Sequence, residues 1–282
     1  MENRFRYVRG WRKKLKALIP RRAKYTFFAS VIEFMLKRTR WLDGGDEPPA
    51  FMDFSGGAFI PLGNRLVQLM VERGGLVKGM NVLDVGCGIG RNAVALSKRF
   101  ANNLHYVGFD IVRFGIVWCR KRFSGSENYR FIHADIYNSF YNPRGSGNAD
   151  SYVFPSADKS VDFIFATSVY THMQASEVDH YLAETARCLK YGGKAYFTCF
   201  ILDAESNAQI ASNKTLFSFR HRSGSAAFTE SVDEPDLAVA FDRVTFEAMA
   251  AKAGLIVSAF YPGSWRGTSY DDFQDAYLMQ LR

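Results

Sequence analysis

Residues 82–92, with the sequence VLDVGCGIGRN, constrain the fold of this chain more than any other stretch. The apolar run that begins at Met80 predicts a buried strand, and the alternating glycines after it predict a tight turn. Apolar residues then recur at helical spacing over residues 92–100, which predicts a helix. A strand, a glycine turn and a helix in this order bring backbone N–H groups and the positive end of a helix against a ligand.

Asp110 is the second feature that restricts the ligand of this turn. It ends the next apolar run, residues 106–109, and follows Gly88 by 22 residues. A doubly wound sheet places an acid at this point, where it accepts hydrogen bonds from a ribose. A dinucleotide-binding turn has the spacing G-x-G-x-x-G, but the position of the third spaced glycine is Arg91 here. A nicotinamide cofactor is therefore disfavoured.

The pattern D-x-G-x-G-x-G, which runs from Asp84 to Gly90, resembles motif I of the class I S-adenosylmethionine-dependent methyltransferases. Together with Asp110 and the later strands, the resemblance extends over residues 55–282. It implies an α/β, Rossmann-like fold with a seven-stranded, mostly parallel sheet in the order 3-2-1-4-5-7-6, strand 7 antiparallel, and helices on both faces. A turn of this kind that binds no ligand is the alternative.

The same resemblance implies S-adenosylmethionine as the cofactor and assigns its contacts. Gly86 and Gly88 would admit the cofactor, and Asp110 would bind its ribose hydroxyls. Asp135 would hydrogen-bond the adenine amino group while Ile136 lies on the ring face; a helix or turn cap is the alternative role for Asp135. The remaining expected contacts are Asp84, through water or backbone near the methionine amine, and Cys87, Ile111 and Ser168.

Two side chains after the predicted strand at residues 161–166 are candidates for catalysis. Tyr170 and His172 lie there, at the sheet edge where a ligand crevice forms. Methyl transfer to a hydroxyl benefits from a base, and the ordinary pKa of histidine, about 6.5, suits that role near neutral pH. The alternatives are a structural histidine before the helix at 177–189 and a tyrosine that packs. No metal-ligand spacing is present, so no metal is expected.

The second half of the chain predicts the remaining elements of the sheet. Residues 177–190 have the pattern of a helix, which Gly192 and Gly193 would end with a turn. A strand is expected to follow at residues 195–202. The last predicted elements are a helix at 246–253 and strands at 255–261 and 273–281.

Residues 206–242 are long for a connection within a compact domain. Long irregular segments at this edge of a sheet usually carry function. We therefore expect an insert at about 204–242 that shapes the acceptor pocket. A disordered surface loop is the alternative.

Positive charge is concentrated at the N-terminus. Residues 1–40 hold 13 Lys and Arg against two Glu, whereas the rest of the chain holds 23 basic and 26 acidic side chains. We expect residues 1–54 to form a basic, partly helical extension and linker outside the domain at 55–282. Such an arm could pack over the cofactor site, lie on an anionic membrane surface or hold phosphates. The resemblance to the methyltransferases also implies a lid over the methionine end of the cofactor, for which Phe59, Arg65 and the glycines near them are candidates. Capping and spacing of an ordinary helix is their alternative role.

Cysteine spacing and hydropathy indicate the compartment. The four cysteines form no C-x-x-C pair, which is typical of reduced, buried thiols in a cytoplasm. No apolar run reaches the roughly 18–20 residues of a membrane span. The expected location is the cytoplasm, with the inner face of a membrane as an alternative because of the basic arm.

These features predict an S-adenosylmethionine-dependent methyltransferase that acts on an oxygen of a small molecule, a sugar or a lipid-linked glycan. Rival interpretations are an RNA or DNA methyltransferase that uses the basic arm, and a cofactor-binding protein without activity. Base-flipping DNA enzymes of this family have Asp or Asn followed by two prolines after strand four. The pair Asn142-Pro143 lies elsewhere and lacks the second proline, which counts against a DNA substrate.

Overall fold

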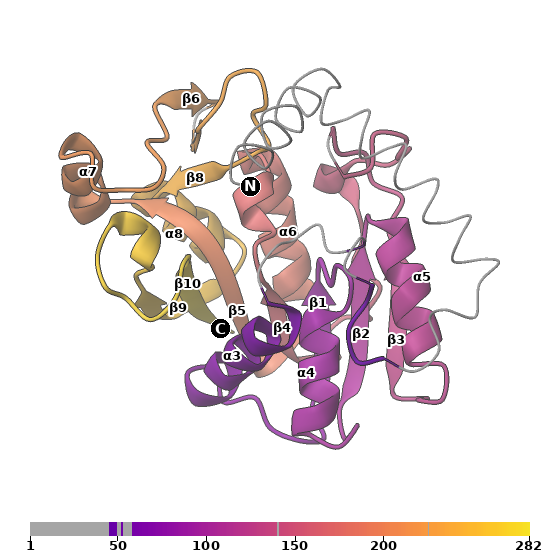
Figure 1. The fold of residues 1–282 in the computed structure, drawn as a ribbon. Helices are drawn as coiled ribbons and strands as arrows, with labels where there is room; N and C mark the ends of the chain where they lie inside the picture. Colours follow the sequence, from indigo (N-terminus) through magenta and orange to yellow (C-terminus); the bar gives the residue numbers. More distant parts are fainter. Residues whose placement is uncertain (1–44, 50–51, 53–57, 140, 225) are drawn as a thin grey trace, which may run out of the picture.

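The computed structural model describes residues 45–49, 52, 58–139, 141–224 and 226–282 (Figure 1). The predicted basic arm at residues 1–40 therefore lies outside the described residues. Within the described ranges, no helix is long and apolar enough to cross a membrane.

Among the described residues, ten strands form one mixed sheet, and helices cover it on both sides (Figure 1). The strands are β1 (Asn81–Val85), β2 (His105–Asp110), β3 (Tyr129–His133), β4 (Val161–Ala166), β5 (Leu189–Leu202), β6 (His221–Ser223), β7 (Ala227–Thr229), β8 (Val239–Asp242), β9 (Leu255–Tyr261) and β10 (Asp275–Leu281). The α-helices are α3 (Phe59–Glu72), α4 (Arg91–Arg99), α5 (Arg113–Arg122), α6 (Ala175–Cys188), α7 (Ala204–Ala211) and α8 (Arg243–Lys252). Short 3-10 helices are η3 (Ala149–Ser151), η4 (Tyr170–His172) and η5 (Ser264–Arg266).

Seven of the strands have the predicted topology. β3, β2, β1, β4 and β5 lie side by side in that order and are all parallel. β10 pairs with β5 in the antiparallel direction, and β9 pairs with β10. With β9 as the sixth and β10 as the seventh strand, the order 3-2-1-4-5-7-6 is confirmed. This arrangement brings the carboxyl ends of β1, β2, β4 and β5 to one edge of the sheet.

The predicted insert forms secondary structure, which adds three short strands, β6, β7 and β8, to the seven of the predicted order. β8 pairs in parallel with the end of β5, and β7 and β6 extend the sheet beyond it (Figure 1). These short strands have their own apolar core, in which Phe200 and Phe219 pack against Trp265. Residues 204–211 form α7, whose first turn Asp203 caps by accepting a hydrogen bond from the Ser206 N–H at 2.9 Å. Sequence periodicity does not reveal strands this short.

The glycine pair expected to end a helix lies inside a strand instead. α6 ends at Cys188 and β5 begins at the next residue, so Gly192 and Gly193 belong to β5. The register between β4 and β5 shifts here, as at a β-bulge. Gly192 has a φ of +75°, and a Cβ on Gly193 would lie 2.8 Å from the carbonyl oxygen of Lys190. The glycines therefore accommodate an irregular strand start.

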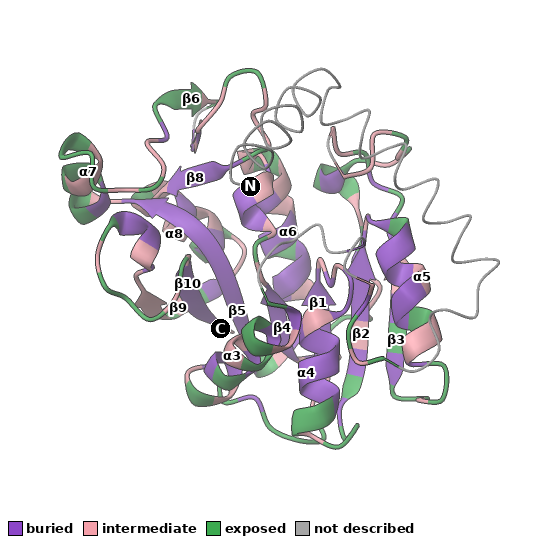
Figure 2. Cartoon of the chain, viewed as in Figure 1, coloured by how far each residue is buried: buried purple, intermediate pink, exposed green. Residues whose placement is uncertain are grey.

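Alternation along the strands gives the sheet two apolar faces. Leu83 and Val85 belong to a buried cluster that includes residues of α6 and α8. Val82 and Tyr106 belong to a second cluster, which includes residues of α3, α4 and α5. Successive side chains of a strand point to opposite faces, and helices on both faces bury the central strands (Figure 2). Residues that end these strands are therefore held firmly at the carboxyl edge.

A buried ion pair fixes the connection between β9 and β10. The side chain of Arg266 is fully buried, and its Nε donates to Asp275 Oδ1 at 2.7 Å. Its Nη1 donates to Asp203 Oδ1 at 2.8 Å. The other Asp275 oxygen, Oδ2, accepts from Trp265 Nε1 at 2.9 Å and from the Ile201 N–H at 2.8 Å. The charges are paired and hydrogen-bonded, which is the condition under which a buried ion pair is tolerated.

Removal of one partner of this pair should destabilise the domain strongly. Arg266→Leu leaves the Asp275 carboxylate buried beside hydrogen-bond donors only, so we expect the free energy of unfolding to fall by about 3–5 kcal/mol. Urea denaturation measures it. The control is Lys252→Ala, which breaks an exposed ion pair with Asp179 and should cost less than about 1 kcal/mol. Equal losses in the two variants would contradict the prediction.

Candidate active site

A cavity of about 570 Å³ opens at the carboxyl edge of the sheet, at the ends of β1, β2, β4 and β5. This is the place where the strand order predicts a ligand crevice. The lining side chains come from the glycine turn, from α3, from the segments after β3 and β4, from α6 and from the segment just before β10. The cavity lies in the size range of small-molecule sites, and most of its surface is apolar.

The glycine turn after β1 has a backbone that other residues rarely adopt. Gly86, Gly88 and Gly90 have φ values of +74°, +56° and +77°. A Cβ on Gly86 would lie 2.4 Å from the side chain of Val169, and one on Gly90 would lie 2.7 Å from the sulfur of Cys119. The glycines thus permit both the turn itself and the close approach of α5 and of the segment after β4.

Asp110 holds this turn and lines the cavity at the same time. Its Oδ2 accepts from the Gly88 N–H at 2.7 Å, and its Oδ1 accepts from the Val112 N–H at 2.7 Å. Burial raises the pKa of Asp110 to about 6, although these hydrogen bonds act in the opposite direction. A carboxylate has about four acceptor positions, so Asp110 can still accept hydrogen bonds from a ligand.

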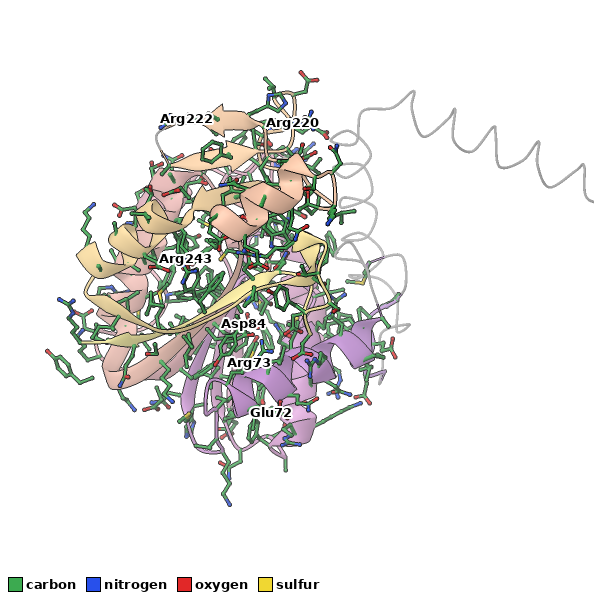
Figure 3. The ribbon with its side chains drawn as sticks, turned by 90° about the vertical axis from the view of Figure 1, so that its left-hand side faces the viewer. Glu72, Arg73, Asp84, Arg220, Arg222 and Arg243 are labelled. Atoms are coloured by element: carbon green, nitrogen blue, oxygen red, sulfur yellow. The ribbon has the colours of Figure 1, made fainter. Side chains whose placement is uncertain are left out.

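Asp84 lies behind the turn and does not line the cavity. It is fully buried, and its Oδ2 accepts a hydrogen bond from the Tyr106 hydroxyl at 2.6 Å. Figure 3 places it inside the body of the domain. Burial raises its pKa to about 8, and its Oδ1 has no hydrogen-bond partner among the described residues. The structure therefore places Asp84 in the core beside Tyr106, without direct access to a ligand in the cavity.

The other expected cofactor contacts divide into two groups. Cys87, Ile111, Ile136 and Ser168 line the cavity together with Asp110. Asp135 is exposed and does not line it; its Oδ2 accepts from the Ser146 hydroxyl at 2.7 Å. This position favours the alternative role of Asp135 as a turn cap.

Sequence reasoning missed a polar network at the ends of β4 and β5. The Ser168 N–H donates to Thr198 Oγ1 at 2.7 Å, and Thr198 Oγ1 donates to Gln274 Oε1 at 2.6 Å. Gln274 Nε2 then donates to the Ser168 hydroxyl at 2.9 Å. Ser168 has a φ of +59°, which is uncommon for a residue other than glycine and occurs at functional sites. No local pattern signals Gln274, because it comes from 106 residues further along the chain.

Asn92, at the start of α4, was also missed. It is 5% exposed and lines the cavity, and its Nδ2 donates to Thr167 Oγ1 at 2.9 Å. Its Oδ1 is buried without a hydrogen-bond partner among the described residues. A buried amide oxygen in this position is suited to accept a hydrogen bond from a ligand. Its place directly after the glycine pattern was the available signal.

His172 lines the cavity, and its ring orientation is fixed. Nδ1 lies 2.9 Å from the carbonyl oxygen of Asp236. A carbonyl can only accept a hydrogen bond, so Nδ1 carries the proton and Nε2 has the lone pair in the neutral ring. Burial lowers the pKa of His172, which keeps the ring neutral at pH 7. The edge of the ring packs against Tyr141.

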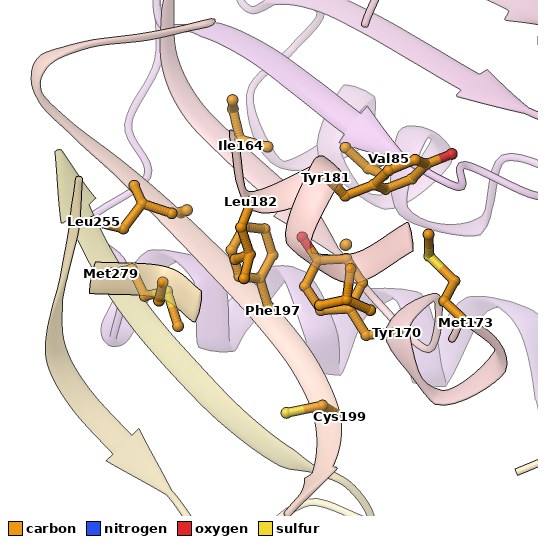
Figure 4. Packing of buried hydrophobic residues seen from close by; sticks show 14 of the residues in the cluster. Val85, Ile164, Tyr170, Met173, Tyr181, Leu182, Phe197, Cys199, Leu255 and Met279 are labelled. Atoms are coloured by element: carbon orange, nitrogen blue, oxygen red, sulfur yellow. The ribbon is translucent and has the colours of Figure 1, made fainter. Parts of the chain in front are cut away.

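Tyr170 does not line the cavity. It is fully buried in the core, where its ring packs against Phe197 with centroids 5.0 Å apart (Figure 4). Phe246 of α8 lies on another side, at 6.3 Å. The structure therefore favours the packing role and gives no support to Tyr170 as a catalytic residue.

The predicted lid residues are also displaced from the cavity. Phe59 is buried against Trp118, and Arg65 lies near Asp272, with 3.6 Å between Arg65 Nε and Asp272 Oδ1. The same helix, α3, instead contributes Leu62 and Leu66 to the cavity wall. These leucines occupy the positions that α3 turns toward the site.

Comparison with known proteins agrees with this geometry. Residues 82–193 match the family model described as "Methyltransferase domain". The chain is 29% identical over 132 residues to methyltransferase GfsG of Streptomyces halstedii, covering 47% of this chain and 42% of that protein. It is 27% identical over 146 residues to the O-methyltransferase rstn1 of Aspergillus nomiae, covering 50% and 55%. These alignments thus span about half the length of either relative.

The fold is also found among solved structures. An S-adenosylmethionine-dependent methyltransferase from Methanosarcina mazei superposes with a TM-score of 0.53 at 16% identity, covering 75% of this chain and 96% of that chain. Residues 82–193 thus match a methyltransferase domain, and the fold around them is the one seen in solved S-adenosylmethionine-dependent methyltransferases. Within the described part of the chain, no three His, Cys, Asp or Glu side chains come together as a possible metal site.

The buried carboxyl of Asp84 should make stability depend on pH. Between about pH 6 and 8 the folded protein retains a proton on Asp84 that the unfolded chain has released, so the free energy of unfolding falls as pH rises. Asp110 is already ionised in most of this range because its pKa is about 6. Asp84→Asn removes the titrating group. As the pH rises, its free energy of unfolding should therefore increase relative to that of wild type by up to about 1.4 kcal/mol per pH unit.

Urea denaturation of both proteins at pH 6, 7 and 8 measures this difference. Asp158→Asn, in which the substituted carboxyl is exposed, is the matched control and should show no such trend. A constant difference between Asp84→Asn and wild type over the range would show that Asp84 is ionised in the folded protein.

Proposed function

We propose that this protein transfers a methyl group from S-adenosylmethionine to a hydroxyl oxygen of a small molecule. The observation that carries the proposal is that one cavity is lined by the glycine turn, by Asp110 and by the neutral ring of His172. The name of the relative from Aspergillus nomiae, an O-methyltransferase, supports oxygen as the acceptor atom.

The residues of the cavity fit the cofactor. Gly86 and Gly88 present bare backbone to the cavity, and Asp110 retains acceptor positions for the ribose hydroxyls. Ile136 is buried in the cavity wall and offers an apolar surface for the adenine ring. The bound cofactor supplies an electrophilic methyl group, so the protein needs to position the acceptor and remove its proton.

His172 is the side chain suited to receive that proton. The Asp236 carbonyl holds the hydrogen on Nδ1, which leaves the Nε2 lone pair as the basic site of the ring. Burial keeps the ring unprotonated near neutral pH and so keeps it available as a base. The rest of the rate enhancement would come from holding the acceptor oxygen in line with the methyl carbon.

The wall around His172 favours an acceptor with an apolar body. Tyr141 packs against His172, and Met173, Tyr181, Leu62 and Phe273 also line the cavity. Its polar lining residues include Glu177, whose Oε2 accepts from the Gln174 N–H at 2.6 Å. An apolar wall with few polar groups selects acceptors by shape and by a small number of hydrogen bonds. A free sugar fits this wall less well than a hydroxylated apolar molecule or a lipid-linked glycan.

Cofactor binding should weaken in acid. If the Asp110 carboxylate accepts from the ribose, then protonation below its pKa of about 6 removes acceptor positions, and the Kd for S-adenosylmethionine should rise about tenfold between pH 7 and pH 5. Calorimetric titration measures it. Asp110→Asn should bind at least tenfold more weakly at pH 7 and show a flatter pH profile, which also reports any titration of the ligand itself.

Asp179→Asn is the control, because its carboxyl pairs with Lys252 on the outer surface and it should match wild type at each pH. A wild-type Kd that stays constant down to pH 5 would exclude the role of Asp110, and no binding at any pH would exclude the proposed function.

Substitution of His172 should separate chemistry from cofactor binding. With an acceptor found by screening hydroxylated small molecules, sugars and lipid-linked glycans for transfer of a labelled methyl group, His172→Gln should lower kcat by about 10²–10⁴. Its Kd for S-adenosylmethionine should stay within about twofold of wild type, because this binding does not require the base. Tyr170→Phe is the control and should retain activity, since Tyr170 does not line the cavity. A kcat unchanged in His172→Gln would exclude the base.

A further inference from the structure

The loop that joins β7 and β8 lies against the cavity wall that holds His172. One residue of this loop, Asp236, contacts three residues from two segments of the domain. Its Oδ2 accepts from the Ser139 hydroxyl at 3.0 Å, and its Oδ1 accepts from Gln174 Nε2 at 3.0 Å. Its backbone carbonyl accepts from His172 Nδ1 at 2.9 Å. The insert is thereby hydrogen-bonded both to Ser139, after β3, and to the segment that holds His172 and Gln174.

The loop that carries Asp236 is itself well ordered by hydrogen bonds. The Glu230 N–H donates to the Ala238 carbonyl at 3.1 Å and closes the loop at its base. The Thr229 hydroxyl donates to the Pro235 carbonyl at 2.9 Å, directly before Asp236. The position of the Asp236 carbonyl is therefore set by the loop and by the two hydrogen bonds to its carboxylate.

Gln174, which donates to the Asp236 carboxylate, has its side-chain amide fixed in one orientation. Its Nε2 donates to Asp236, and its Oε1 accepts from the Ser223 hydroxyl at 2.7 Å. Both the nitrogen and the oxygen of this amide thus bond to the insert, while the Gln174 backbone N–H donates to Glu177 at the start of α6. Asp236 and Ser223 together attach the insert to the start of α6.

A neutral histidine can carry its hydrogen on either ring nitrogen, and only one form presents a lone pair on Nε2. In this chain, the group that selects the form is the Asp236 carbonyl. A hydrogen-bond acceptor on one ring nitrogen orients a histidine ring and fixes which nitrogen carries the hydrogen. The carbonyl can do so only while the Asp236 side chain keeps the loop against Ser139 and Gln174.

We propose that Asp236 is a positioning residue that attaches the insert to the cavity wall and thereby fixes the Nδ1–H tautomer of His172. The inference rests on the proposed function, in which Nε2 receives the acceptor proton. Asp236 itself does not line the cavity, so it acts through His172. The insert then has a second task besides shaping the acceptor pocket: it determines which nitrogen of the base is available.

Nitrogen NMR of the full-length protein with ¹⁵N-labelled histidine tests the tautomer directly. The chain has five histidines, and the His172 signals are assigned by their loss in His172→Gln. In wild type at pH 8, where the ring is neutral, we expect a protonated Nδ1 and an unprotonated Nε2. Asp236→Ala should give a mixture of the two tautomers, and its kcat should fall at least tenfold while its Kd for S-adenosylmethionine stays within about twofold.

Two further variants separate positioning from general damage to the loop. Asp236→Asn keeps an oxygen for Gln174 and gains an N–H that can donate to the Ser139 hydroxyl, so it should restore the tautomer of wild type. Asp233→Ala removes an exposed carboxyl of the same loop and should change neither the tautomer nor kcat.

The outcomes distinguish this inference from the proposed function. A wild-type ring protonated on Nε2, or an unchanged tautomer in Asp236→Ala, would overturn the role of Asp236 even if methyl transfer is observed. Failure to bind S-adenosylmethionine in calorimetry would overturn the proposed function, whatever tautomer the spectra show.

Discussion

The hydrogen bonds that the Asp110 carboxylate accepts from the backbone of the glycine turn and from Val112 are the interactions on which the site depends. A turn with three glycines in the left-handed region loses much conformational freedom on folding, and the two hydrogen bonds from Gly88 and Val112 to one side chain offset that cost. The same contacts bury the carboxylate and raise its pKa to about 6. The group that shapes the turn is therefore also the group that can respond to a bound ligand.

The opposite wall of the cavity depends on a second buried charge. The Asp275 carboxylate accepts hydrogen bonds from Arg266, Trp265 and the Ile201 backbone, and so fixes the connection that leads into β10. Gln274, the preceding residue, can then reach Ser168 and Thr198 across the end of the sheet. Both walls therefore use a buried carboxylate to organise backbone, but only Asp110 lines the cavity.

The part of the cavity around the glycine turn could be predicted from the sequence because its contacts are local. Asp110 lies 22 residues from Gly88, and strand, turn and acid each have a recognisable pattern. Gln274 and Asp236 could not be predicted, because they reach Ser168 and His172 from 106 and 64 residues away. The other differences between prediction and structure concern burial. The sequence did not reveal that Asp135 is exposed or that Asp84 is buried behind the turn, because an acid near the end of a strand can be either exposed or buried.

This division between local and distant contacts has a consequence for specificity. The part of the cavity around the glycine turn is formed by consecutive elements, β1 to β3, one face of which packs against α3, α4 and α5. The part around His172 combines η4 and α6 with an insert that has its own small core around Phe200 and Trp265. A change within the insert can alter the acceptor wall and the setting of His172 without disturbing Asp110 or the glycine turn. Acceptor choice can therefore vary in such a chain while the affinity for the cofactor is retained.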